Sequence, residues 1–246
     1  MIDIIGDVHG CYDEMIALLK KTGYSVGDDE LLSSPEGRKL AFLGDLTDRG
    51  PNSVGVLRFA IKNWKEDRIL YCPGNHCDKL YRYFLGRNVQ QKHGLETTVE
   101  ELKSLNKKEY TFISEGFKRM VENSPLYLTL DEGKLVVAHA GIRGDLIGKT
   151  NKKVKTFVLY GDITGETHAD GRPVRRDWAK AYTHDTFVIY GHTPVNEPRF
   201  LNHTVNIDTG CVFGNRLTLL RWPEKKIVDV PSEQPFVEEK FRPLGE

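Results

Sequence analysis

The chain has 246 residues, in which 35 lysines and arginines balance 35 aspartates and glutamates, and 39% of the residues are hydrophobic. This is the composition of an ordinary globular protein. The zero net charge argues against a protein that coats nucleic acid or an anionic membrane, because either task needs a large positive field. No stretch approaches the roughly 18 uncharged apolar residues of a membrane span, and the first residues lack the pattern of a secretion signal.

Length and cysteine content predict the domain organisation and the cellular location of the protein. No linker rich in Pro, Gly or Ser divides the chain, so we expect a single domain spanning residues 1–246. The four cysteines are few and irregularly spaced, which is typical of reduced thiols in the cytoplasm and argues against a structural zinc site. We therefore expect a cytoplasmic monomer with no membrane partner.

Short apolar runs that end in Gly, Asp, Asn or His recur along the chain and predict buried strands. Six such runs lie at residues 2–5, 40–43, 69–72, 135–138, 187–190 and 205–207. Between the first three, apolar residues recur at helical spacing over residues 12–19 and 54–64. This alternation predicts a βαβαβ unit and a largely parallel sheet.

Residues 86–123 are polar, rich in Lys and Glu, and carry apolar residues at helical spacing, so they predict a helical insertion over one face. After residue 204 the pattern favours strands without helices, at 217–220 and 227–230, and predicts an antiparallel extension. The expected fold is α/β, with two sheets in a β-sandwich flanked by helices. Because ligands bind at the carboxyl ends of strands in α/β sheets, the polar residues that follow the strands form the candidate site.

Six of the side chains that follow predicted strands are of metal-ligand type. They are Asp7, His9, Asp45, Asn75, His139 and His192. Three oxygen donors, three imidazoles and no thiolate suit Mn, Fe, Ni, Co or Zn. Because six ligands exceed the needs of one tetrahedral ion, we expect two ions that share a bridging carboxylate, an arrangement that serves in-line displacement at phosphorus. Each residue alone could instead form a turn or a hydrogen bond in the core, but their joint occurrence favours the metal centre.

Five short motifs occur where these strands end. They are Gly6-Asp7-Val8-His9-Gly10, Gly44-Asp45-Leu46-Thr47-Asp48-Arg49-Gly50, Gly74-Asn75-His76, His139-Ala140-Gly141 and Gly191-His192-Thr193. In this order they resemble the signatures of the calcineurin-like metallophosphoesterases, in the branch that contains the PPP protein phosphatases and the diadenosine tetraphosphate hydrolases. The resemblance implies the metallophosphoesterase type of two-sheet β-sandwich.

Other segments resemble one bacterial group within this family, the asymmetrical bis(5'-nucleosyl)-tetraphosphatases, which also show protein phosphatase activity. The segments are residues 74–83, 93–98, 160–167 and 206–214. This resemblance implies hydrolysis of diadenosine tetraphosphate to AMP and ATP by a metal-bound hydroxide. It also implies two divalent transition-metal ions, with nickel or manganese expected first and iron, cobalt or zinc as alternatives.

The resemblance further implies a role for each residue of the motifs. One ion would take Asp7 and His9, Asp45 would bridge, and the second ion would take Asn75, His139 and His192. His76 would be the general acid that protonates the leaving group, kept protonated by Asp48. Arg49 would bind phosphate oxygens with its two-pronged guanidinium, which Lys would do less well. Asp208 matches a catalytically important aspartate in the phosphatase module of bacterial polynucleotide kinase-phosphatase and would take a supporting role.

Four arginines outside the motifs are candidate substrate contacts, because acidic phosphates need cationic partners. They are Arg143, Arg172, Arg175 and Arg176, although the last three could equally form a solvated basic run. The expected partner is a small-molecule dinucleoside polyphosphate, with a phosphoprotein as the second option.

Three other functions stay open. A phosphomonoesterase acting on phosphotyrosine or another phosphoprotein would use the same residues, although Cys77 stands where the protein phosphatases carry an acid. A nucleic-acid-end phosphatase is suggested by the similarity of residues 172–178 and 207–211 to the kinase-phosphatase module, but the zero net charge argues against the basic groove that it needs. A non-catalytic scaffold would lack a ligand or the acid, and neither is missing from the sequence.

Overall fold

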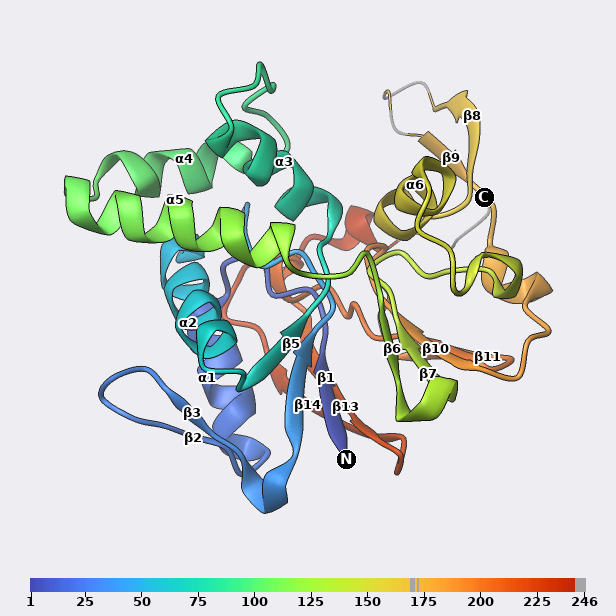
Figure 1. The fold of residues 1–246 in the computed structure, drawn as a ribbon. Coiled ribbons are helices and arrows are strands. Elements are labelled where there is room, and N and C mark those ends of the chain that lie inside the picture. The colour runs from blue at the N-terminus through green and yellow to red at the C-terminus, as the bar shows by residue number, and fades with distance from the viewer. Residues whose placement is uncertain (169–170, 172, 242–246) are drawn as a thin grey trace.

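Figure 1 shows the helices and strands of the computed structural model, which describes residues 1–168, 171 and 173–241. Two five-stranded sheets make up the centre of the molecule. In spatial order the first contains β14 (Lys226–Pro231), β13 (Arg216–Trp222), β1 (Ile2–Ile5), β4 (Lys39–Phe42) and β5 (Ile69–Tyr71). The second contains β11 (Arg199–Leu201), β12 (Thr204–Asn206), β10 (Phe187–Tyr190), β7 (Leu135–Val137) and β6 (Leu128–Leu130). The expected pair of sheets is confirmed.

Both sheets combine parallel and antiparallel strands. In the first, β1, β4 and β5 are parallel and β13 and β14 are antiparallel additions, as the sequence predicted for the two ends of the chain. In the second, β10 is parallel to β7 and β12, while β6 and β11 are antiparallel edge strands. The parallel strands of each sheet therefore end at one edge, where the loops after them carry the candidate site.

The two sheets pack face to face over a shared apolar layer. Ile4 and Ala41 belong to this layer, whereas their neighbours Ile5 and Phe42 pack on the opposite face, because successive side chains of a strand alternate. The second sheet contributes to the shared layer through Leu135, Val137, Ile189 and Val205. The interior of the sandwich thus fixes the two sheets, and their loops, relative to each other.

Helices cover the outer faces of both sheets (Figure 1). The first sheet is covered by α1 (Tyr12–Lys21) and α2 (Ser53–Lys65), and the second by α6 (Lys152–Tyr160). Beside α2 lie α4 (Leu95–Lys103) and α5 (Lys107–Glu122), and α3 (Asn75–Phe84) packs against both of them. The insertion predicted at 86–123 is therefore the helix pair α4 and α5, preceded by an irregular segment. Among the described residues, no helix has the length and apolar character that crossing a membrane requires.

Several elements were not predicted from the sequence. They are α3, α6, β6, β11 and two hairpins, formed by β2 (Ser25–Val26) with β3 (Leu32–Ser33) and by β8 (Ile163–Thr167) with β9 (Pro173–Arg175). Strands β6 and β11 have three residues each and lie at sheet edges, and much of β8 is exposed. Such strands contain no continuous apolar run, which is the signal that identified the others.

Candidate active site

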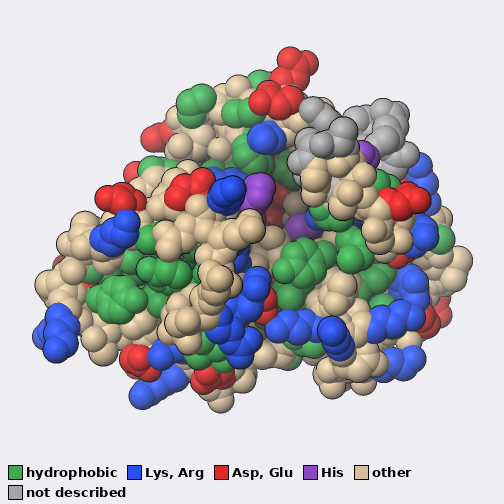
Figure 2. All heavy atoms as spheres, turned by 90° about the horizontal axis from the view of Figure 1, so that it is seen from above, with side chains coloured by type: hydrophobic (Ala, Val, Ile, Leu, Met, Phe, Trp, Pro, Cys, Tyr) green, Lys and Arg blue, Asp and Glu red, His purple; other side chains and the backbone are tan. Residues whose placement is uncertain are grey.

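The polar residues that follow the parallel strands meet at one end of the sandwich. The first sheet supplies Asp7, His9, Asp45, Asn75 and His76 from the ends of β1, β4 and β5. The second supplies His139, His192 and Asp208 from the ends of β7, β10 and β12. Figure 2 views this end of the molecule and shows a hollow with histidine side chains beside it and lysines and arginines around it. Asn75 and His192 are partly exposed and the other six residues are buried.

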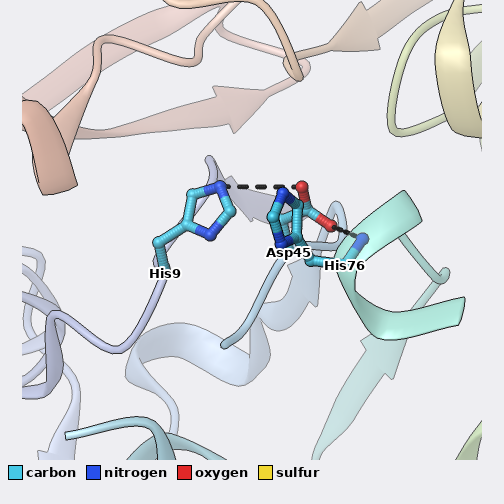
Figure 3. A group of neighbouring side chains, drawn as sticks. All are labelled: His9, Asp45 and His76. Atoms are coloured by element: carbon cyan, nitrogen blue, oxygen red, sulfur yellow. Dashed lines mark hydrogen bonds and ion pairs between the residues drawn. The ribbon is translucent and has the colours of Figure 1, made fainter. Parts of the chain in front are cut away.

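One group at the site consists of His9, Asp45 and His76 (Figure 3), whose ligand-type atoms lie within 4.8 Å of one another. Oδ2 of Asp45 is 3.6 Å from Nε2 of His9, and Oδ1 accepts a hydrogen bond of 3.0 Å from the backbone N–H of His76. The grouping alone admits His76 as well as His9 as a metal ligand.

A second group shares Asp45 with the first. Nε2 of His139 lies 3.0 Å from Oδ1 of Asn75, 3.1 Å from Nδ1 of His192 and 3.3 Å from Oδ2 of Asp45. One imidazole nitrogen carries at most one proton and cannot donate to three such atoms. Metal–ligand bonds of about 2.0–2.2 Å place neighbouring donor atoms about 3 Å apart, as observed here. The presence of Asp45 in both groups fits a bridging carboxylate.

Two buried polar atoms of the site have no hydrogen-bond partner within the described ranges. They are Oδ1 of Asp7 and Nδ1 of His139. The other carboxylate oxygen of Asp7, Oδ2, accepts a hydrogen bond of 3.1 Å from the N–H of His192. An unpaired buried polar atom costs about 1–3 kcal/mol, and more when it is charged, unless a cation compensates it. The donor set therefore fits divalent metal ions.

Two glycines of the motifs leave room for the carboxylates. A Cβ atom at Gly74 would lie 2.1 Å from Oδ1 of Asp45, and a Cβ atom at Gly191 would lie 2.3 Å from Oδ1 of Asp7. Any side chain at either position would displace a candidate ligand. The glycines of the Gly-Asn-His and Gly-His-Thr motifs are thus required by the site itself.

The loops hold several site residues in strained backbone conformations. Five of them have positive φ angles, namely His9 (45°), Asp45 (36°), Asp48 (78°), Arg49 (74°) and His192 (72°). Each costs on the order of 1–3 kcal/mol and persists only where surrounding contacts impose it. Contacts between the loops contribute, since the N–H of His9 donates to the carbonyl oxygen of Asp45 at 2.8 Å.

Three buried carboxylates are crowded together at the site, those of Asp7, Asp45 and Asp208. Burial alone would raise the pKa of Asp45, but His139 and His76 hold it well below its usual range, so this carboxylate is ionised. Burial would lower the pKa of His139, but Asp45 and Asp7 raise it to about 9. Burial and the neighbouring Asp208 raise the pKa of Asp7, and burial raises the pKa of Asp208 to about 6. Carboxylates crowded in this way lack sufficient counter-charge, which favours the binding of cations.

His9 and His192 are held in the neutral form that binds metals. Burial and the charge of Arg49 lower the pKa of His9, and burial and His139 lower the pKa of His192. Nδ1 of His9 lies 2.7 Å from the carbonyl oxygen of Thr47, so Nδ1 carries the proton and Nε2 presents its lone pair. The backbone of the Gly-Asp-Leu-Thr-Asp-Arg-Gly motif thus orients a candidate ligand from the preceding motif.

The contacts of His76 fit the role of a general acid. Its Nδ1 lies 2.6 Å from Oδ2 of the buried Asp48, and its Nε2 lies 2.8 Å from Nη2 of Arg49. The second guanidinium nitrogen, Nη1, lies 2.9 Å from Nε2 of His9. Because a guanidinium only donates, His76 accepts at Nε2 and carries its proton on Nδ1 in this structure. A carboxylate on Nδ1 orients the ring and stabilises a second proton on Nε2, as a general acid requires.

The four arginines predicted to contact the substrate differ in their contacts with the site. The charge of Arg175 lowers the pKa of His192, and its Nε donates to the carbonyl oxygen of Tyr160 at 2.7 Å. Two others pair with nearby carboxylates, Arg143 with Asp145 at 3.0 Å and Arg176 with Asp162 at 3.3 Å. Arg172 lies outside the described residues. The electrostatic contact with a candidate ligand favours Arg175, and substrate binding by any of the four stays a prediction.

Sequence reasoning missed the residues that support Asp48 and Arg49. Oγ1 of Thr98 donates to Oδ1 of Asp48 at 2.7 Å, and Oγ1 of Thr97 accepts from the N–H of Arg49 at 2.9 Å. Both threonines belong to the segment 93–98, which the sequence linked to the family without assigning it a task. The resemblance of residues 93–98 to the family was the feature of the sequence that could have pointed to these two threonines.

The comparison with protein families agrees with this geometry. The sequence model of the calcineurin-like phosphoesterases matches residues 1–196. The chain belongs to this family, in which the active centre contains two divalent metal ions.

Individual relatives match almost the whole chain. The asymmetrical bis(5'-nucleosyl)-tetraphosphatase PrpE of Anoxybacillus flavithermus is 62% identical over 98% of both chains. The protein of the same name in Bacillus subtilis is 57% identical over 98% of this chain and 99% of its own. A crystal structure described as that of a candidate diadenosine tetraphosphatase shares the fold, with a TM-score of 0.64 and 23% identity over 94% of this chain and 93% of the other.

Proposed function

We propose that this protein is a phosphoric anhydride hydrolase that cleaves diadenosine tetraphosphate asymmetrically, to AMP and ATP. The observation that carries the proposal is the 62% identity, over 98% of both chains, with an enzyme named for this activity. The site supports it, because six ligand-type side chains lie beside an arginine and a histidine–aspartate pair. This combination has the groups needed to bind cations, bind a phosphate and protonate a leaving group.

The six ligand-type residues would hold two divalent cations. Asp7 and His9 would bind one, Asp45 both, and Asn75, His139 and His192 the other. When bound, the cations supply a hydroxide nucleophile at neutral pH and stabilise charge on the phosphoryl oxygens. We propose nickel or manganese, with iron, cobalt and zinc as alternatives, since all accept a mixture of imidazole and carboxylate donors.

The chain itself binds the substrate and delivers the proton. The guanidinium of Arg49 offers paired donors to two phosphoryl oxygens. Because it contacts His76 at 2.8 Å, an oxygen held by Arg49 would lie beside the Nε2 atom of His76. When Arg49 turns from His76 to the phosphate, Nε2 of His76 takes up a proton, which Asp48 stabilises through Nδ1, and donates it to the departing oxygen. Asp208, whose charge raises the pKa of Asp7, supports the site by adding to the negative charge around the ligands.

The proposed substrate is a small-molecule dinucleoside polyphosphate, and Arg49 and Arg175 would neutralise part of its charge. We propose that residues 1–246 act as one catalytic domain, because both sheets contribute candidate ligands. We further propose a monomer that acts in the cytoplasm without a nucleic-acid partner.

Chromatography of the products from diadenosine tetraphosphate tests the proposal. Equal amounts of AMP and ATP would support it, whereas two molecules of ADP would contradict asymmetrical cleavage. A phosphotyrosine peptide and an oligonucleotide with a terminal phosphate belong in the same assay. Turnover of either one without turnover of the dinucleotide would identify a phosphomonoesterase or a nucleic-acid-end phosphatase instead. Asp45→Asn, which should be inactive on every substrate, controls for contaminating phosphatases, and mass spectrometry of the purified protein identifies the metals.

A further inference from the structure

The helical insertion holds the turn that carries Asp48 and Arg49. The carbonyl oxygen of Gly94 and the Oγ1 atom of Thr97 accept hydrogen bonds from the N–H of Arg49, at 3.2 and 2.9 Å. Oγ1 of Thr98 donates to Oδ1 of Asp48 at 2.7 Å and accepts from the N–H of Asp48 at 3.1 Å. The side chains of Asp48 and Thr98 are completely buried. The start of α4 therefore contacts both the backbone and the carboxylate of the turn.

A carboxylate further along α4 fixes the residues that follow the turn. Oε1 and Oε2 of Glu101 accept hydrogen bonds from the N–H groups of Ser53 and Val54, at 2.9 and 2.8 Å. These are the first residues of α2, whose N–H groups have no partner within their own helix. Oγ of Ser53 accepts a hydrogen bond of 3.1 Å from the N–H of Asp48. Helix α4 thus supports the turn and the helix that continues it.

The turn needs this support because of its backbone conformation. Asp48 and Arg49 have φ angles of 78° and 74°, a region that residues other than glycine seldom adopt without external contacts. The two carboxylate oxygens of Asp48 have different partners. Oδ2 lies 2.6 Å from Nδ1 of His76, and Oδ1 accepts a hydrogen bond from Thr98. A carboxylate that is anchored at one oxygen can rotate, whereas one anchored at both holds the imidazole in one orientation.

We propose that Thr98 is a positioning residue for the reaction, which fixes the carboxylate of Asp48 against His76, and that Thr97 positions Arg49. The inference rests on the proposed function, because it assumes that His76 acts as the general acid. Loss of the Thr98 hydroxyl should weaken proton donation to the leaving group while leaving the metal ligands in place. The helical insertion is then part of the catalytic apparatus as well as a cover over α2.

The test compares Thr98→Val with Thr98→Ser on two phosphate esters. Phenyl phosphate has a basic leaving group that needs a proton, and p-nitrophenyl phosphate has one that leaves without it. Thr98→Val should lower kcat on phenyl phosphate by about 10- to 100-fold, the range typical for loss of a partner that orients a functional group. It should lower kcat on p-nitrophenyl phosphate much less, with little change in KM on either. Thr98→Ser keeps the hydroxyl and should restore the wild-type pattern.

Thr111→Val is the matched control. Thr111 is exposed on α5 of the same insertion, and its hydroxyl donates to the carbonyl oxygen of Lys107 at 2.8 Å, within its own helix. This variant should behave as wild type on both esters. Thr97→Val supplies a contrast. A displaced Arg49 should raise KM and lower kcat/KM to the same extent for both esters.

Two results would overturn the proposal. One is a loss in Thr98→Val that is equal for good and poor leaving groups, which would indicate damage to packing. The other is a Thr98→Ser variant as impaired as Thr98→Val, which would show that activity depends on the shape of the side chain at this position and not on its hydroxyl. Because both esters are simple monoesters, the comparison holds even if diadenosine tetraphosphate is not cleaved, so a failed function proposal is recognised separately.

If the protein hydrolyses neither ester, an NMR measurement that needs no turnover tests the proposal. Because of the 2.6 Å contact with Asp48, the Nδ1 proton of His76 should give a proton NMR signal far downfield, and its disappearance in His76→Ala would identify it. The signal should persist in Thr98→Ser and be shifted or lost in Thr98→Val. An unchanged signal in folded Thr98→Val would contradict the proposed positioning.

Discussion

Nη2 of Arg49 lies 2.8 Å from Nε2 of His76, so the side chain expected to bind phosphate contacts the side chain expected to protonate the leaving group. A phosphoryl oxygen that takes the place of either contact comes within reach of both residues. Binding and proton transfer are therefore coupled through adjacent atoms, and substitutions of the two residues should have different signatures.

Arg49→Lys should lower kcat/KM by about 10²-fold, although it keeps the positive charge. An ammonium cannot offer two parallel donors, nor contact His9 and His76 at the same time as the guanidinium does. Steady-state kinetics on diadenosine tetraphosphate measure the loss, and circular dichroism should show an unchanged fold. Activity equal to that of the wild type would remove Arg49 from the reaction.

His76→Ala should keep both metals and lose roughly 10²–10⁴-fold in rate on a phosphate ester with an alkyl leaving group. The loss on p-nitrophenyl phosphate should be much smaller, because its phenolate leaves without a proton. Asp48→Asn should show the same dependence in weaker form, since the imidazole stays while the carboxylate at 2.6 Å is neutralised. Loss of a metal from His76→Ala, measured by mass spectrometry, would make His76 a ligand and refute the assignment.

Asp45→Asn should reduce both metal content and rate, the rate by roughly 10²-fold or more. The reason is that Oδ2 of Asp45 lies in both ligand groups, 3.6 Å from His9 and 3.3 Å from His139. Metal analysis of the purified variant, alongside kinetics, measures the effect. Two tightly bound metals and full activity would rule out the bridging role.

Arg175→Ala should raise KM for diadenosine tetraphosphate roughly 10- to 100-fold, because a hydrogen bond to a charged group contributes about 1.5–3 kcal/mol. Hydrolysis of p-nitrophenyl phosphate, which lacks the additional phosphates, should change little. Arg176→Ala is the matched comparison, since Arg176 is exposed and paired with Asp162. Equal losses on both substrates in Arg175→Ala would point to damage of the hairpin instead of a lost substrate contact.

Removal of metal by a chelator should lower Tm, and nickel or manganese should restore it. A cation at about 100 times its Kd stabilises the folded state by about 2.7 kcal/mol, or roughly 5–10 °C in Tm for a domain of this size. Differential scanning fluorimetry measures the shift. The shift should be smaller in Asp45→Asn, and a Tm independent of metal in the wild type would argue against the centre.

The sequence predicted most reliably those strands that are buried along their length. The run at residues 2–5 became β1, and the run at 187–190 became β10, because both are central strands buried on two faces. Helix α3 was missed because only His76, Cys77 and Leu80 are buried in it, so it lacks a long apolar stripe. Its first residues were recognised as a motif, and their helical conformation follows from packing at the site.

The ligand-type residues could be proposed from sequence because each directly follows a strand, and strand ends converge. The support of Asp48 by Thr98 could not, since the two residues are 50 positions apart and meet only when α4 packs against α2. Likewise, nothing local in the sequence indicates that the carbonyl of Thr47 sets the tautomer of His9. Such contacts depend on how the elements are packed, which a pattern of residues along the chain does not record.

The candidate ligands are divided between the two sheets, with Asp7 and Asp45 after strands of the first and His139 and His192 after strands of the second. Neither half of the chain alone can assemble the full coordination shell. With the proposed ligand set, cations would be captured with full affinity only after the two sheets have docked, so that metal uptake would mark the completion of folding. Partially folded molecules would then compete poorly for scarce metal, and a nascent chain would acquire its cofactor only once its second sheet is in place.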